Sequence, residues 1–164
     1  MKFANIIGKG KSLDFLQQSD LHSDGVNIGI CEATFQVKCK IGFQGDDREG
    51  EKICRENVKS IWKAPECSLY PEASIITFDQ KTLGLYPPSV VIITAFLIDF
   101  GFEYFNYYCF DAITHGDCTY PESINYSIGK YGAPERYLTQ KAKLLKVLGN
   151  ANYTFYTPTE RQPK

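Results

Sequence analysis

Few residues of this 164-residue chain have the types and spacing of a catalytic or phosphate-binding site. The segment Lys9-Gly10-Lys11-Ser12 resembles the end of a phosphate-binding loop, but Asn5 stands where such a loop needs its first glycine. His115, Asp117 and Cys118 share one predicted loop, and no third group there could orient a nucleophile. We therefore expect a flexible polar start, a solvated turn and no enzymatic activity.

The cysteines could bind a metal ion or form disulfides. They have no paired C-x-x-C spacing, and the two histidines are far apart in the sequence, so we expect no metal site. A count of six in one domain indicates an oxidising compartment. Two sequons, which begin at Asn125 and Asn152, are glycosylation candidates and also favour a secreted, extracellular protein. The disulfide candidates are Cys31, Cys39, Cys54, Cys67, Cys109 and Cys118.

Composition limits the classes of partner. A net charge of −1 provides neither a basic field for nucleic acid nor a polybasic membrane anchor. The apolar run from Ser89 to Phe100 is too short to cross a bilayer, and Asp99, Glu103 and Asn106 interrupt its continuation. We expect one domain over residues 1–164, with no nucleic-acid partner and no membrane span; a homo-oligomer stays open.

The elements that must position these residues are mostly predicted strands. Alternating or β-branched patterns predict strands over 27–40, 51–55, 72–78, 90–98, 102–110 and 123–128. The strands 90–98 and 102–110 are expected to form an antiparallel hairpin. The range 133–148 has helical spacing, with Pro134 near its start and Gly149 after its end, and 152–157 predicts a short closing strand.

Many consecutive strands remove their exposed edges by closing on themselves. We therefore expect an all-β protein, an eight-stranded antiparallel up-and-down barrel over about residues 8–130. The C-terminal α-helix is expected to pack outside this barrel, which would enclose room for one small ligand.

Motifs along nearly the whole chain are similar to those of the lipocalin family, especially its arthropod bilin-binding and crustacyanin-like branch. Val90 to Asp111, which contains Tyr107-Tyr108-Cys109, resembles the family's strand–turn–strand signature. Cys31-Glu32-Ala33-Thr34-Phe35 resembles its second-strand element, and Thr157 to Gln162 its trailing Thr-x-x-Gln stretch. The family's Gly-x-Trp tryptophan is absent, since Gly10-Lys11-Ser12 stands at that place.

The resemblance implies a carrier that holds a small hydrophobic ligand, such as a bilin or another lipophile, and requires no cofactor. The family's usual disulfides need two outer cysteines that this chain lacks, so we predict that Cys39 pairs with Cys54 instead. The inward strand register of the family gives a set of predicted ligand-binding residues. These are Phe35, Val91, Ile93, Ala95, Leu97, Tyr104, Asn106, Tyr108, Phe110, Ile124 and Tyr126.

Two other functions stay open at this point. A salivary-type lipocalin would inhibit a partner protein through loops 20–26 and 115–120. A sushi-type adhesion module could occupy Phe35 to Cys67, because Cys39, Trp62 and Cys67 resemble that module's residues. A bond between Cys39 and Cys67 would distinguish the sushi module from the hairpin pairing.

Overall fold

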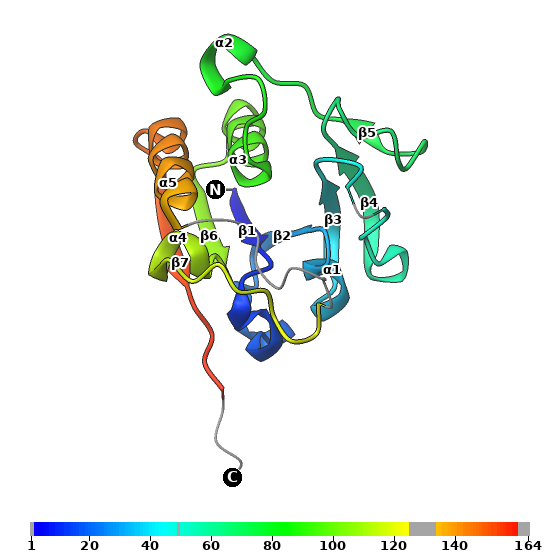
Figure 1. Cartoon of the computed structure of the whole chain (residues 1–164), viewed down its shortest axis with the longest axis vertical. Helices are drawn as coiled ribbons and strands as arrows, with labels where there is room; N and C mark the ends of the chain where they lie inside the picture. The colour runs from blue at the N-terminus through cyan, green and yellow to red at the C-terminus, as the bar shows by residue number, and fades with distance from the viewer. Residues whose placement is uncertain (1, 49, 125–133, 161–164) are drawn as a thin grey trace.

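The centre of the protein is an open, parallel β-sheet. The computed structural model describes residues 2–48, 50–124 and 134–160 (Figure 1). Its seven strands are all parallel and have the order β5-β4-β3-β2-β1-β6-β7. They are β1 (Phe3–Ile7), β2 (Gly25–Ile30), β3 (Cys39–Gln44), β4 (Val58–Lys63), β5 (Ser74–Ile75), β6 (Tyr104–Tyr108) and β7 (Asn152–Tyr156). The predicted antiparallel barrel is therefore wrong, and the chain is an α/β protein.

Helices cover the two faces of this sheet unequally. The α-helices are α1 (Ala33–Gln36), α2 (Gln80–Leu83), α3 (Ser89–Asp99), α4 (Asp111–His115) and α5 (Pro134–Leu148). Short 3-10 helices are η1 (Lys11–Phe15), η2 (Gln18–Asp20) and η3 (Arg55–Asn57). On one face, α3 and α5 bury Ile6, Phe105 and Tyr107 in the main core, whereas η1 and α1 cover Ile7 and Tyr108 on the other (Figure 1).

The predicted strand over 90–98 is the helix α3. Its β-branched residues Val91, Ile92 and Ile93 favoured a strand, but an unbroken apolar run has neither a helical nor a strand period. The helix is apolar around most of its circumference because it packs both on the sheet and against the neighbouring helix α5. The predicted hairpin is therefore replaced by a helix that leads into β6.

Other predicted strands are interrupted, shortened or not formed, and the range 51–55 contains no strand and ends at the start of η3. The range 27–40 contains the end of β2, the turn of α1 and the start of β3, because the backbone at Cys31 turns to a φ of 50°. The range 72–78 holds only β5, and of 123–128 only the first two residues are described, neither of them in a strand. The segment proposed as a sushi module contributes β3 and β4 to the common sheet.

The C-terminal helix and strand occur where the sequence predicts them, but in a different setting. α5 packs beside α3 on an open sheet rather than outside a barrel, and β7 is an edge strand next to β6. The central strand β1 was not predicted. The chain adds β2 to β5 on one side of β1 and then places β6 on its other side, so the strand order reverses between β1 and β6.

Candidate functional site

A cavity of about 770 Å³ lies at the carboxyl ends of the central strands. Its wall includes the residues that follow β1, β2, β3, β4 and β6, together with the start of α3 and one side of α5. In open parallel sheets, ligands bind outside the carboxyl ends of the strands where the strand order reverses. This cavity, which we call the switch cavity, has that position.

The loop after β1 approaches the end of β6 closely enough to require glycine. The Gly8 amide donates to the Tyr108 carbonyl at 2.8 Å, and the Gly10 amide donates to the Cys109 carbonyl, also at 2.8 Å. A Cβ atom at Gly10 would overlap Asp111 Oδ2 and lie 2.6 Å from the Cys109 carbonyl oxygen. The two glycines therefore hold the intervening residue, Lys9, at the junction of β1 and β6.

A buried carboxylate fastens this loop from the other side. Asp111, at the start of α4, is 5% exposed, and its Oδ2 accepts hydrogen bonds from the Ser12 hydroxyl at 2.7 Å and the Ser12 amide at 3.2 Å. The carboxylate thus satisfies an amide that η1 leaves unpaired at its first turn. The segment 9–12, predicted as a flexible start, is tied to the centre of the fold.

Lys9 is the charged group that this arrangement presents to the cavity. Its ammonium lies 3.5 Å from Glu32 Oε1 and 5.5 Å from the centre of the Tyr120 ring. Burial by itself lowers the pKa of Lys9, but Coulombic interactions with Cys31, Glu32 and Tyr120 outweigh it and raise the pKa above its usual value. Lys9 is therefore a cation in the cavity wall at neutral pH.

The two cysteines beside Lys9 have unusual backbones and unreactive thiols. Cys31 and Cys109 follow β2 and β6, line the cavity and have φ values of 50° and 65°. Burial raises the pKa of the Cys31 thiol to about 11 and that of Cys109 to about 12. Neither thiol forms a thiolate near neutral pH, so we assign them no nucleophilic role.

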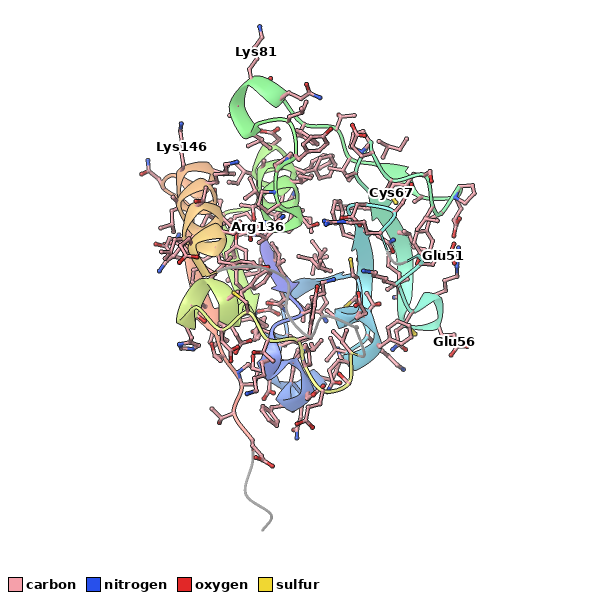
Figure 2. All side chains as sticks on the ribbon, viewed as in Figure 1. Glu51, Glu56, Cys67, Lys81, Arg136 and Lys146 are labelled. Carbon is pink, nitrogen blue, oxygen red and sulfur yellow. The ribbon has the colours of Figure 1, made fainter. Side chains whose placement is uncertain are left out.

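Another part of the wall is formed by one side of α5. Arg136, Gln140 and Lys143 are spaced at i, i+4 and i+7, which places them on the same side of the helix, and all three line the cavity. Figure 2 shows Arg136 on the side of α5 that faces α3, whereas Lys146 points away from the molecule. α5 therefore adds two further cations, Arg136 and Lys143, to the cavity wall.

Basic side chains outnumber acidic ones in the cavity wall. Among the residues that the structure describes, the wall contains Lys9, Arg48, Lys52, Arg136 and Lys143 on the basic side and Asp46 and Glu66 on the acidic side. Since the whole chain has a net charge of −1, positive charge is concentrated at this cavity. A cavity lined by one sign of charge attracts ligands of the opposite sign.

Apolar side chains at the mouth are left exposed to solvent. Leu85 and Tyr86 precede α3, line the cavity and are 58% and 76% exposed. Phe78 lines the same wall and is partly buried against the core. The cavity therefore combines cations with an exposed aromatic ring.

The structure scatters the residues that the sequence grouped into a ligand site. Of the members of that set that the structure describes, only Phe110 lines the switch cavity. Val91, Ile93 and Leu97 are buried in the core on α3, Ala95 is partly buried there, and Phe35 on α1 is 61% exposed.

The remaining predicted ligand residues lie elsewhere in the fold. Tyr104, Asn106 and Tyr108 lie on β6, on the face away from α3, and the Asn106 side chain donates to Asn5 Oδ1 at 3.1 Å. Ile124 packs against the smaller core under η1, and Tyr126 lies outside the described residues. The barrel register that united them does not exist in a parallel sheet.

The cavity residues that the sequence reasoning missed carry a readable signal. Ile6-Ile7 followed by Gly8-Lys9-Gly10 is a short apolar strand that ends in a glycine-rich turn, as in the first strand of many α/β folds. The α5 stripe could have been found from its i, i+4, i+7 spacing. Nothing in the sequence placed Lys9 beside Glu32.

The other predicted features have these positions. All six cysteines are thiols in the structure. A disulfide between Cys39 and Cys54 under oxidising conditions stays a prediction. Asn152 is exposed on β7, and Asn125 lies outside the described residues.

Over residues 2–48, 50–124 and 134–160, no group of three or more His, Cys, Asp or Glu could hold a metal ion. Within the same ranges, no helix has the length and apolar character needed to cross a membrane.

Comparison with known proteins assigns no family. No family model matches the chain, and neither a curated protein nor a solved structure is significantly similar to it. Nothing among these comparisons identifies a lipocalin, so functional inference depends on the switch cavity itself.

Proposed function

We propose that the chain binds a small anionic ligand that carries a planar ring, the chemistry of a nucleoside phosphate, in the switch cavity. The observation that carries this proposal is the cationic Lys9 in the cavity wall, held by Gly8 and Gly10 where the strand order reverses. The cavity volume of about 770 Å³ is in the usual range for small-molecule sites, roughly 300–1,000 Å³.

The charges of the wall support the anionic part of the ligand. Lys9 follows β1, and Arg136 and Lys143 lie on α5, so two separate elements contribute cations to the wall that would attract an anionic group. Lys9 is already engaged by Glu32 at a long 3.5 Å, and an incoming phosphate would compete for the same ammonium. We therefore expect removal of the Glu32 charge to tighten binding rather than weaken it.

The exposed aromatic ring supports the planar part of the ligand. Stacking of a base on an aromatic side chain contributes about 1–3 kcal/mol in nucleic-acid-binding proteins. Tyr86 lines the cavity mouth with three-quarters of its surface in solvent, so a ring that covers it needs no rearrangement of the core.

Calorimetric titration of the full chain tests this function. Nucleoside diphosphates, inorganic phosphate and unphosphorylated nucleosides are titrated separately, and we expect the complete nucleotides to bind most tightly. Lys9→Met should weaken nucleotide binding by about 10- to 150-fold, since a hydrogen bond to a charged group contributes about 1.5–3 kcal/mol. Lys143→Met should weaken it less, because Lys143 is exposed.

Lys146→Met is the matched control, because it removes the same charge from α5 on the side that points away from the molecule (Figure 2). Equal affinities of wild type and the Lys9 variant would exclude the switch cavity as the nucleotide site. Failure of every nucleotide to bind would refute the proposed ligand class.

A small apolar ligand, the class predicted from the sequence, is the second candidate. Phe78, Ile92 and Ile113 line the switch cavity and could bury a lipophile. The same titration with biliverdin and a fatty acid tests this hypothesis. Binding of these ligands that is insensitive to Lys9→Met, together with no nucleotide binding, would favour the apolar carrier. No reaction is proposed, and the prediction that the chain is not an enzyme stays a prediction.

A further inference from the structure

The edge strand β7 lacks the features that normally protect the edge of a sheet. It has no charged residue, proline or glycine between Asn152 and Tyr156, and within the described residues it pairs only with β6. The opposite edge of the sheet, β5, is only two residues long and offers little to pair with. Figure 1 shows β7 at the margin of the sheet, and β7 is the last strand in the strand order.

Hydrogen bonds to β6 determine which backbone groups of β7 face outward. The Asn152 amide donates to the Glu103 carbonyl at 2.9 Å, and the Tyr156 carbonyl accepts from the Cys109 amide at 3.1 Å. Alternate residues of a strand direct their backbone groups to the same side. Tyr153 and Phe155 therefore direct their N–H and C=O groups away from the sheet.

These outward groups are symmetric about Thr154. If a second copy is related to the first by a two-fold axis that passes midway between their Thr154 residues, Tyr153 of each copy lies opposite Phe155 of the other. That pair is a hydrogen-bonded pair of an antiparallel ladder, in which each residue both donates to and accepts from its neighbour. The pairing also places aromatic residues opposite each other, which stabilises cross-strand contacts.

We propose that β7 is a self-association edge, where two copies of this chain pair antiparallel across a two-fold axis at Thr154. A second copy fits better than an unrelated strand because the register is self-complementary and no charged side chain meets its own copy across the axis. The exposed sides of Tyr153 and Tyr156, 45% and 42%, lie along the edge that the second copy would cover. The result is a continuous sheet through both copies.

Sedimentation velocity over a concentration series tests this proposal on the full chain. The protein is produced in a bacterial host so that the sequon at Asn152 carries no glycan. We expect the wild type to form a dimer as its concentration rises. Residues at a non-hydrogen-bonded position such as Thr154 have Cα atoms about 4.5 Å apart across the ladder. Thr154→Lys and Thr154→Glu should therefore each be monomeric, because like charges face each other.

An equimolar mixture of these two variants should recover the dimer, because opposite charges then meet at the axis. Ser60→Lys, an exposed substitution on β4, is the matched control and should dimerise like the wild type. Circular dichroism and thermal unfolding check that each variant is folded. A wild type that stays monomeric, a dimer that persists in both single variants, or a mixture without recovery would each overturn the proposal.

Discussion

Replacement of Gly10 by alanine should separate packing from backbone freedom at the switch cavity. Gly10 has φ −71° and ψ 170°, a conformation open to any residue, so glycine is needed there for space alone. The added Cβ would overlap Asp111 Oδ2 and lie 2.6 Å from the Cys109 carbonyl oxygen and 2.8 Å from the Asp111 amide nitrogen. Two of these three atoms belong to the backbone and cannot rotate away.

The expected loss follows from these contacts. Overpacking costs about 1–3 kcal/mol, and the backbone contacts favour the upper end of that range. Alanine also lowers the conformational entropy of the unfolded chain, and this effect stabilises the folded state by about 0.4–1 kcal/mol. The net loss in the free energy of unfolding is therefore about 2 kcal/mol, or about 4–8 °C in Tm for a chain of this size.

Urea unfolding with a common slope for wild type and variant measures this loss. Gly101→Ala is the control, because Gly101 has φ 87° and no neighbour within 4 Å of an added Cβ, so its cost is conformational alone. Removing the Asp111 side chain relieves one of the three overlaps, so Gly10→Ala in an Asp111→Ala background should regain less than half of the loss. A Gly10→Ala variant with wild-type stability would refute the close approach of the β1 loop to β6.

Three other measurements test the site and its support. Ser12→Ala leaves one hydrogen bond of the buried Asp111 carboxylate unmade and should cost about 1.5–3 kcal/mol in denaturant unfolding; a loss below about 0.5 kcal/mol would mean that solvent replaces the hydroxyl. Burial raises the thiol pKa of Cys31 to about 11 and of Cys109 to about 12 from an ordinary 9.0. The folded state therefore keeps these protons to higher pH than the unfolded state, so stability should be full below about pH 9 and fall toward pH 11; a flat urea midpoint over this range would contradict the burial of the thiols. Leu144→Ala empties a fully buried position on α5 and should cost about 2–5 kcal/mol, with Leu138→Ala, on the exposed side of the same helix, near neutral in a parallel thermal melt.

Sequence patterns predicted the positions of several elements correctly but predicted antiparallel instead of parallel strand pairing. The helix over 133–148 and the strand after it were predictable because α5 has an amphipathic spacing and a glycine at its end. The segment 102–110 was correctly predicted to contain a strand. The neighbouring range 90–98 was wrongly predicted as a strand. An unbroken run of β-branched residues suits either a buried strand or a buried helix, and only the surrounding structure decides between the two. That error turned a parallel crossover into an antiparallel hairpin, and the barrel followed from it.

The candidate site was harder to predict than the elements. Lys9, Cys31 and Cys109 come from three separate segments, and they approach each other only because β1 lies between β2 and β6. The lysine and the two glycines beside it were visible as a glycine-rich turn. Their functional position was hidden because the strand before them, Phe3–Ile7, was not identified.

The sequence by itself determined local tendencies: where an amphipathic helix forms, where glycine ends a segment, and that the charges nearly balance. Those tendencies depend on near neighbours in the chain, so they can be read from spacing. Only the tertiary structure decided that the sheet is parallel, that its order reverses beside Lys9, and that cations gather at one cavity. These depend on contacts between residues about 100 positions apart, such as that of Ser12 with Asp111, which no local pattern specifies.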